Sequence, residues 1–158
     1  MSEQNPYARY LDGRPLEAIL AGTPPDLAAL HQAFGTERIK TPLAPGKWNP
    51  AQVTCHLADC EVAFGFRLRQ TLAEENHVIQ PFDQDRWATP YGQIPAEDAL
   101  AAFTALRRWN LVLIAVSLPK AGDRRATHPE RGEMTFRTIV ETMAGHDINH
   151  LSRLKAVV

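Results

Sequence analysis

The stretch TFRTIVETMAGHDINHLSRLKA, residues 135–156, decides the fold class because its apolar residues recur at the three- and four-residue spacing of a helix. The apolar positions that define this stripe are Phe136, Val140, Met143 and Leu154. Continuing the helical wheel places Asp147 and His150 within the stripe and His146 at its edge. The segment therefore predicts a helix with one face in a core, and three polar side chains interrupt that face.

The two histidines of this helix are spaced to act together. His146 and His150 are four residues apart, which leaves them about 40° apart around the axis with Cβ atoms about 5–6 Å from each other. Burying a polar group costs on the order of 1–3 kcal/mol unless a partner satisfies it, and one metal ion would satisfy both imidazoles. The zincin motif is absent, because Asp147 follows the first histidine where that motif has glutamate.

Three further segments, residues 16–34, 50–75 and 95–118, show helical signals, and no stretch alternates convincingly as a strand. We therefore predict an all-α fold, a four-helix bundle, with a single domain over residues 1–158. The connection over residues 76–94 is long enough for a crossover between the second and third helices, and its prolines and aromatic residues are typical of a lid or binding loop that packs down.

Local signals predict where the helices begin. Asn49 and Pro50 form an N-cap followed by a first-turn proline, so the second helix begins there. Thr23 and Pro24 show the same pattern inside the first segment, so we expect a short first turn and then a longer helix. Residues 120–133 are polar and turn-rich, and we expect a connector there.

A third histidine on another core-facing helix extends the pair. His56 lies near the edge of the apolar stripe of the second helix, which can face the fourth helix in a bundle. Three histidine ligands would leave a position for water, the arrangement typical of a catalytic zinc site. Of the other histidines, His31 is expected to be a hydrogen-bonded core residue, and His77 and His128 to be solvated in loops.

Carboxylates and a thiol near these histidines are candidates for supporting roles. Asp147 points inward on the wheel and is our candidate for proton transfer, while Asp59 and Glu61 could orient the ligands. A structural or surface role is the alternative for each of them. Cys60 lies one turn after the second-helix histidine and is expected to be a small buried residue. Its spacing from Cys55 disfavours a disulfide between the two.

Composition bounds the class of protein. The chain has 158 residues, of which 44% are hydrophobic and 22% charged, and its formal net charge is −1, so a nucleic-acid-binding role has no support. No apolar run approaches the roughly 20 residues that cross a bilayer, so we expect no membrane association. The N-terminal residues 1–6 show no signal-peptide pattern, and two cysteines suit a reduced compartment, so we expect a cytoplasmic protein.

These pieces, in this order, resemble the DinB/YfiT-like metalloenzyme family from residue 47 onward. The segments that carry the resemblance are KWNP at residues 47–50, HLAD at 56–59, PFD at 81–83 and GHDINHL at 145–151, with Glu61, Arg67 and Trp87. The resemblance implies a four-helix bundle, often a homodimer, with a metal site of His56, His146 and His150. One departure is Arg153, where many relatives carry glutamine, and it affects the outer part of the pocket rather than the three ligands.

The expected function is that of a divalent-metal-dependent enzyme acting on a small molecule. A three-histidine ion with an open position suits either a hydrolase or a transferase that uses a low-molecular-weight thiol. Zinc or nickel is the expected metal, with iron, copper and manganese as alternatives. The alternatives to an enzyme are a non-catalytic metal- or ligand-binding bundle and a purely structural dimerisation bundle.

Overall fold

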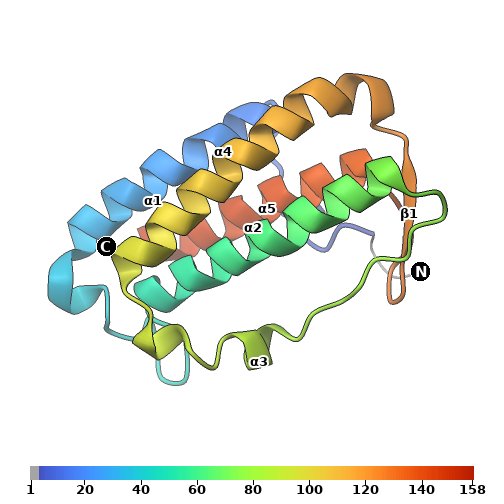
Figure 1. Ribbon diagram of the computed structural model, residues 1–158. Coiled ribbons are helices and arrows are strands. Elements are labelled where there is room, and N and C mark those ends of the chain that lie inside the picture. The colour runs from blue at the N-terminus through green and yellow to red at the C-terminus, as the bar shows by residue number, and fades with distance from the viewer. Residues whose placement is uncertain (1–3) are drawn as a thin grey trace.

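Four long helices form a bundle in the computed structural model, which describes residues 4–158 (Figure 1). The long helices are α1 (Leu16–Arg38), α2 (Pro50–Ala73), α4 (Ala96–Ala121) and α5 (Phe136–Lys155). Short helical turns are η1 (Ala8–Tyr10), α3 (Gln84–Trp87) and η2 (Tyr91–Gln93). Residues 1–3 lie outside the described residues. They belong to the predicted domain over residues 1–158 and to the N-terminal residues 1–6, which show no signal-peptide pattern. The predicted helical bundle is confirmed.

The bundle contains a crossover, as the long second connection indicated. Helices α2 and α4 run in one direction and α1 and α5 in the other (Figure 1). Residues 74–95, which join the end of α2 to the beginning of α4, run back along the outside of the bundle. Helix α2 packs against α4 and α5, and α1 packs against the same two helices. The antiparallel pair α2 and α5 therefore brings the beginning of one helix beside the end of the other.

Two helix starts follow the local signals. The Asn49 side chain accepts a hydrogen bond from the Gln52 backbone N–H at 2.8 Å, and the Gln52 side chain accepts one from the Asn49 backbone N–H at 3.0 Å. This capping box, with Pro50 in the first turn, fixes the beginning of α2. Thr135 caps α5 by accepting from the Thr138 backbone N–H at 3.1 Å. Both predicted starts are confirmed to within one residue.

The predicted break at Thr23 and Pro24 is wrong, because α1 continues through both residues. A proline lacks the N–H that would bond the carbonyl four residues earlier, here that of Leu20. The Arg107 guanidinium donates to this carbonyl at 3.0 Å, and the Thr23 hydroxyl donates to Ile19 O at 3.1 Å. A side chain from α4 thus satisfies an acceptor that the helix itself leaves free, so the helix tolerates the proline.

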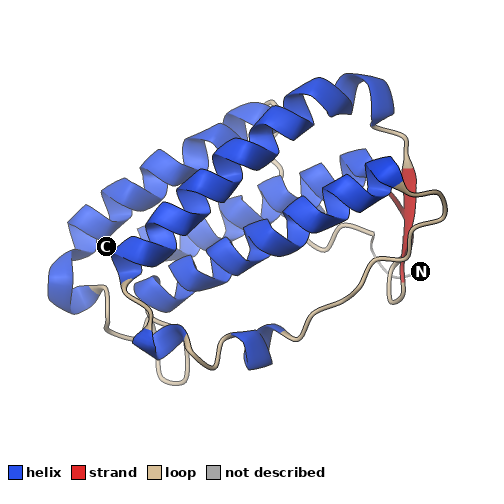
Figure 2. Ribbon diagram, viewed as in Figure 1, coloured by secondary structure: helices blue, strands red, loops and turns tan. Residues whose placement is uncertain are grey.

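The expectation of no strands is also wrong, because a small hairpin lies between α4 and α5 (Figure 2). Strands β1 (Arg125–His128) and β2 (Gly132–Thr135) pair antiparallel, and Val78 bridges to Thr127 from the crossover. This pairing buries His128, and His77 is buried beside it, so the expectation that these two histidines are solvated is corrected. Four-residue strands are too short to show a reliable alternation in sequence.

Helix α4 has an unusual distribution of apolar side chains. By length and composition it is apolar enough to cross a membrane, but it packs against α1 and α2, and its buried face carries Arg107 and Asn110. Its outer face exposes Trp109, Val112 and Val116. Arg107 and Asn110 make ion pairs and hydrogen bonds with residues of the other helices, so one face of α4 forms part of the interior of the bundle.

Candidate metal centre

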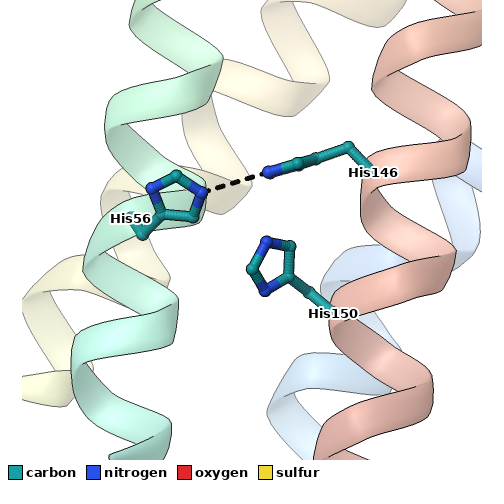
Figure 3. Close-up of side chains that lie close together, drawn as sticks. All are labelled: His56, His146 and His150. Atoms are coloured by element: carbon teal, nitrogen blue, oxygen red, sulfur yellow. Dashed lines mark hydrogen bonds between the residues drawn. The ribbon is translucent and has the colours of Figure 1, made fainter. Parts of the chain in front are cut away.

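Three histidines from two helices converge between the beginning of α2 and the end of α5 (Figure 3). His56 projects from α2, and His146 and His150 project from α5. Their potential ligand nitrogens all lie within 4.8 Å of one another, and the Nε2 atoms of His56 and His146 are 3.1 Å apart. This separation is close to the edge, about 3.4 Å, that two nitrogens span when each lies about 2.0–2.1 Å from one tetrahedral ion.

Burial keeps these imidazoles neutral. It lowers the pKa of His56 to about 4. Burial, followed by the nearby His56 and Arg153, lowers the pKa of His150 to about 3. The pKa of His146 is also lowered well below its usual value, first by burial and then by the other two histidines. Only a neutral imidazole offers a lone pair to a metal, so the three rings are in the ligating form at neutral pH.

The ring nitrogens of His146 have no oxygen acceptor or donor as a hydrogen-bond partner among the described residues. His146 is fully enclosed, and its Nδ1 is a buried polar atom without a hydrogen-bond partner among the described residues. Its Nε2 faces the Nε2 of His56 rather than an oxygen acceptor. The two facing Nε2 atoms suit ligands of one shared ion, whereas the unpaired Nδ1 is a separate buried polar atom that an ion bound at Nε2 would not satisfy. The donor set, three imidazole nitrogens, fits a divalent zinc, nickel, copper or iron ion.

Cys60 touches the cluster but is not placed as a fourth ligand. Its Sγ lies 3.6 Å from Nε2 and 3.8 Å from Nδ1 of His56, and 4.0 Å from Nε2 of His146. The sulfur thus contacts both nitrogens of the His56 ring, and Cys60 is not part of the group of converging ligand atoms. Cys60 is buried, and it and Cys55 are free thiols, as expected.

A pocket of about 620 Å³ opens beside His56 and His150. The other residues that line it include Tyr7, Leu43, Lys47, Trp48, Gln84, Asp85, Asn149 and Arg153. The Trp48 ring lies 5.0 Å from the His56 ring, centroid to centroid, and forms part of the pocket wall. Trp87, in the crossover connection, packs on Phe82 at 4.7 Å between ring centroids and does not line the pocket.

The N-terminal segment covers the inner side of the cluster, which the sequence did not reveal. The Tyr7 ring stands edge-on to His146 at 5.1 Å between centroids. A Cβ built at Gly145 would lie 2.5 Å from the Tyr7 carbonyl oxygen, so only glycine permits this approach to α5. A glycine inside a helix costs about 1 kcal/mol relative to alanine, and this cost was the available signal that another segment packs there.

A buried ion-pair cluster adjoins the histidines and contains two of the carboxylates singled out above. Arg107 donates to Glu61 Oε1 at 2.6 Å and to Asp147 Oδ2 at 2.5 Å and Oδ1 at 3.2 Å. The Thr23 hydroxyl donates to Asp147 Oδ2 at 2.7 Å, and the Asn110 amide donates to Glu61 Oε2 at 3.0 Å. We refer to these five residues as the Arg107 cluster.

The Arg107 cluster changes the interpretation of the two acids. Asp147 points inward as predicted, but both of its oxygens are held by Arg107 and Thr23, so it has a structural role, and its catalytic role stays a prediction. Arg107, which the sequence analysis did not single out, is 1% exposed. Asp59 is half-buried and accepts from the Tyr91 hydroxyl at 2.6 Å, outside this cluster.

His31 is the remaining histidine, and it lies apart from the metal centre. Its Nε2 lies 2.8 Å from the Thr54 hydroxyl, and Thr54 is itself buried and donates to Pro50 O. His31 is thus hydrogen-bonded, as expected, although its side chain is only partly buried. It supplies no fourth donor to the three-histidine group.

Comparison with known proteins gives matches to one family and one fold. The family profile of the DinB superfamily matches residues 19–154. A protein of Oceanobacillus iheyensis named "Putative metal-dependent hydrolase" is 33% identical over 126 residues, which cover 78% of this chain and 73% of that protein. A protein of Geobacillus kaustophilus with the same name is 28% identical over 145 residues, which cover 89% and 80% of the two chains.

A solved structure shows the same fold. YfiT from Bacillus subtilis, described as "a probable metal-dependent hydrolase with an unusual four-helix bundle topology", superimposes with a TM-score of 0.83. The likeness covers 90% of this chain and 83% of that one at 21% identity. At this identity the likeness concerns the fold, including the order in which the helices are connected.

Proposed function

The chain belongs to the DinB superfamily, and we propose that it is a metal-dependent hydrolase whose ion is held by His56, His146 and His150. The observation that carries the proposal is the convergence of three neutral imidazoles, two buried and one half-buried, beside a pocket. The names of the relatives from Oceanobacillus and Geobacillus support the reaction class. Zinc or nickel is the proposed metal.

In this proposal the three histidines hold the ion and the other pocket-lining residues contact the substrate. The three histidines would hold the ion beside the pocket, while Trp48 and Tyr7 line the pocket and would limit the access of bulk water. A divalent ion with an open position lowers the pKa of bound water towards neutrality and polarises a carbonyl group. Hydrolysis of a small ester or amide needs both of these effects.

Transfer to a low-molecular-weight thiol is the second candidate reaction. The same three ligands can hold a thiolate, because thiolates are strong ligands for zinc. The observation that favours it is the pair of cationic side chains, Lys47 and Arg153, on the pocket wall, which suits an acidic thiol. A small-molecule substrate is common to both reactions.

A homodimer and a cytoplasmic location stay predictions for this chain, as does the absence of nucleic-acid and membrane partners. Large apolar side chains are exposed on the neighbouring helices α2 and α4, where a second copy would cover them. They are Val62, Phe66, Trp109, Val112 and Val116. Sedimentation of the wild type beside a Phe66→Lys variant tests the dimer, which the added charge is expected to weaken.

Elemental analysis of untagged protein tests the metal centre. We expect close to one equivalent of zinc or nickel in the wild type and little in a His150→Ala variant with the same helical content by circular dichroism. His31→Ala is the matched control, because His31 is a helical histidine outside the cluster, and it is expected to keep the metal. A folded wild type that takes up no metal even when incubated with zinc or nickel contradicts the proposal and leaves a structural dimerisation bundle as the better interpretation.

Turnover separates the enzyme from a non-catalytic binding bundle. The metal-loaded wild type and His150→Ala are compared on small esters, amides and thiol-transfer substrates. Metal-dependent turnover that His150→Ala abolishes supports the enzyme. Stoichiometric metal with no exchange of water or added thiol at the ion indicates a closed binding site instead.

A further inference from the structure

The wall of the pocket beside the histidines carries an excess of positive charge. Its charged side chains are Lys47, Asp85 and Arg153, which sum to one net positive charge while the histidines are neutral. Neither cation forms an ion pair or a side-chain hydrogen bond with any described residue. Unpaired cations on a concave surface attract anions more strongly than the same groups on an open surface.

The two cations are exposed side chains that line the same pocket as His56 and His150. Arg153 follows His150 by three residues on α5, so it projects from the same helix face about 4.5 Å further along the axis. Lys47 lies in the turn before α2, where its backbone N–H bonds to Ala44 O at 3.0 Å. A ligand that reaches from the ion towards both cations would span the pocket.

We propose that Lys47 and Arg153 form an anion subsite that binds a carboxylate of the substrate while the reacting group lies at the three histidines. This inference rests on the proposed metal-dependent function and names the substrate class: a small carboxylate-bearing molecule. The guanidinium of Arg153 can pair with both oxygens of a carboxylate. One net positive charge, with Asp85 opposing, matches a singly charged carboxylate better than a doubly charged phosphate.

The neighbouring lysine on α5 provides a matched control. Lys155 is exposed near the same helix end, but its Nζ pairs with Asp26 at 2.7 Å, and neither residue lines the pocket. Removing the Lys155 charge therefore changes the net charge of the protein as Arg153→Gln does, without changing the pocket.

Binding of two matched thiols to the zinc-loaded protein tests the subsite. The probes are 3-mercaptopropionate and its neutral amide, which offer the same sulfur to the metal and differ in the carboxylate. Calorimetric titration should show about tenfold tighter binding of the carboxylate, because charge-assisted hydrogen bonds are the stronger ones. The Lys47→Gln/Arg153→Gln variant should bind both probes alike, and Lys155→Gln should keep the tenfold preference. A thiol of the same length that carries a phosphonate in place of the carboxylate should bind no more tightly than 3-mercaptopropionate.

The outcomes separate this inference from the proposed function. Zinc-loaded wild type that binds the two probes equally, or binds neither, overturns the anion subsite and leaves the metal centre intact. A preference that survives in the double variant also overturns it. Protein that takes up no zinc overturns the proposed function and this inference together.

Discussion

Two buried polar clusters lie side by side in this bundle, and they are built in opposite ways. The Arg107 cluster pairs one cation with two carboxylates, and its groups come from all four long helices. The three-histidine cluster contains only imidazoles. Burial and the two neighbouring histidines lower the pKa of His146, and its Nδ1 has no hydrogen-bond partner among the described residues. The first cluster pairs its opposite charges within the chain, although Arg107 Nε has no hydrogen-bond partner among the described residues, whereas the second brings like nitrogens together with no opposite charge between them.

This difference distinguishes a structural polar core from a binding site. A buried charge that has lost its partner is strongly destabilising, so the Arg107 cluster holds α2 and α5 in a fixed relation. The histidines project from those same two helices. The Arg107 cluster therefore stabilises the arrangement of α2 and α5 on which the geometry of the three histidines depends.

The largest expected effect is that of removing the cation. Arg107→Met leaves Glu61 and Asp147 buried without their partner, and we expect a loss of about 3–5 kcal/mol in the free energy of unfolding. Urea denaturation measures it. Arg108→Met, which changes an exposed neighbour, should stay within about 0.5 kcal/mol. A loss below 1 kcal/mol for Arg107→Met would show that the cluster does not hold the frame.

Acidification should destabilise the histidine cluster next. The folded-state pKa of His56 is about 4 and that of His150 about 3, both below the unfolded value of about 6.5. Between pH 6.5 and about 4 the unfolded chain binds more protons, so stability falls as the pH falls, by up to about 1.4 kcal/mol per pH unit for each histidine. Above pH 6.5 these residues contribute no slope.

Urea denaturation of metal-free protein at several values between pH 6.5 and 5.5 measures this slope. A His56→Gln/His150→Gln variant should show a clearly shallower slope, whatever its absolute stability. An unchanged slope in that variant would mean that the histidines are not kept neutral by burial, and the contrast between the two clusters would lose its basis.

The smallest expected effect concerns the cover over the histidines. Gly145→Ala places a methyl group against the Tyr7 backbone, and we expect a net loss of about 1–2 kcal/mol as the N-terminal segment shifts. Gly22→Ala is the control, because no atom lies within 4 Å of its added Cβ, and it should be neutral or stabilising. Thermal unfolding of both variants decides, and a shift of the same sign in both would argue against the close approach of Tyr7.

Local signals in the sequence determined the four helices and nominated the three histidines. Caps such as Asn49 and Thr135 act within one turn, and the apolar stripe of α5 repeats every three or four residues, so both can be identified in a single segment. The same stripe showed that His150 and Asp147 face inward. These features depend on neighbours close in the chain, and the chain order alone specifies them.

The tertiary structure decided what those residues contact. It joined His56 to His146 across 90 positions, satisfied the Leu20 carbonyl beside Pro24 with Arg107, and laid Tyr7 against α5. In the tertiary structure Asp147 forms an ion pair with Arg107 and does not contact the histidines through a hydrogen bond. Each of these contacts depends on which helices are neighbours and which way they run, and periodicity within one helix carries no information about its partner.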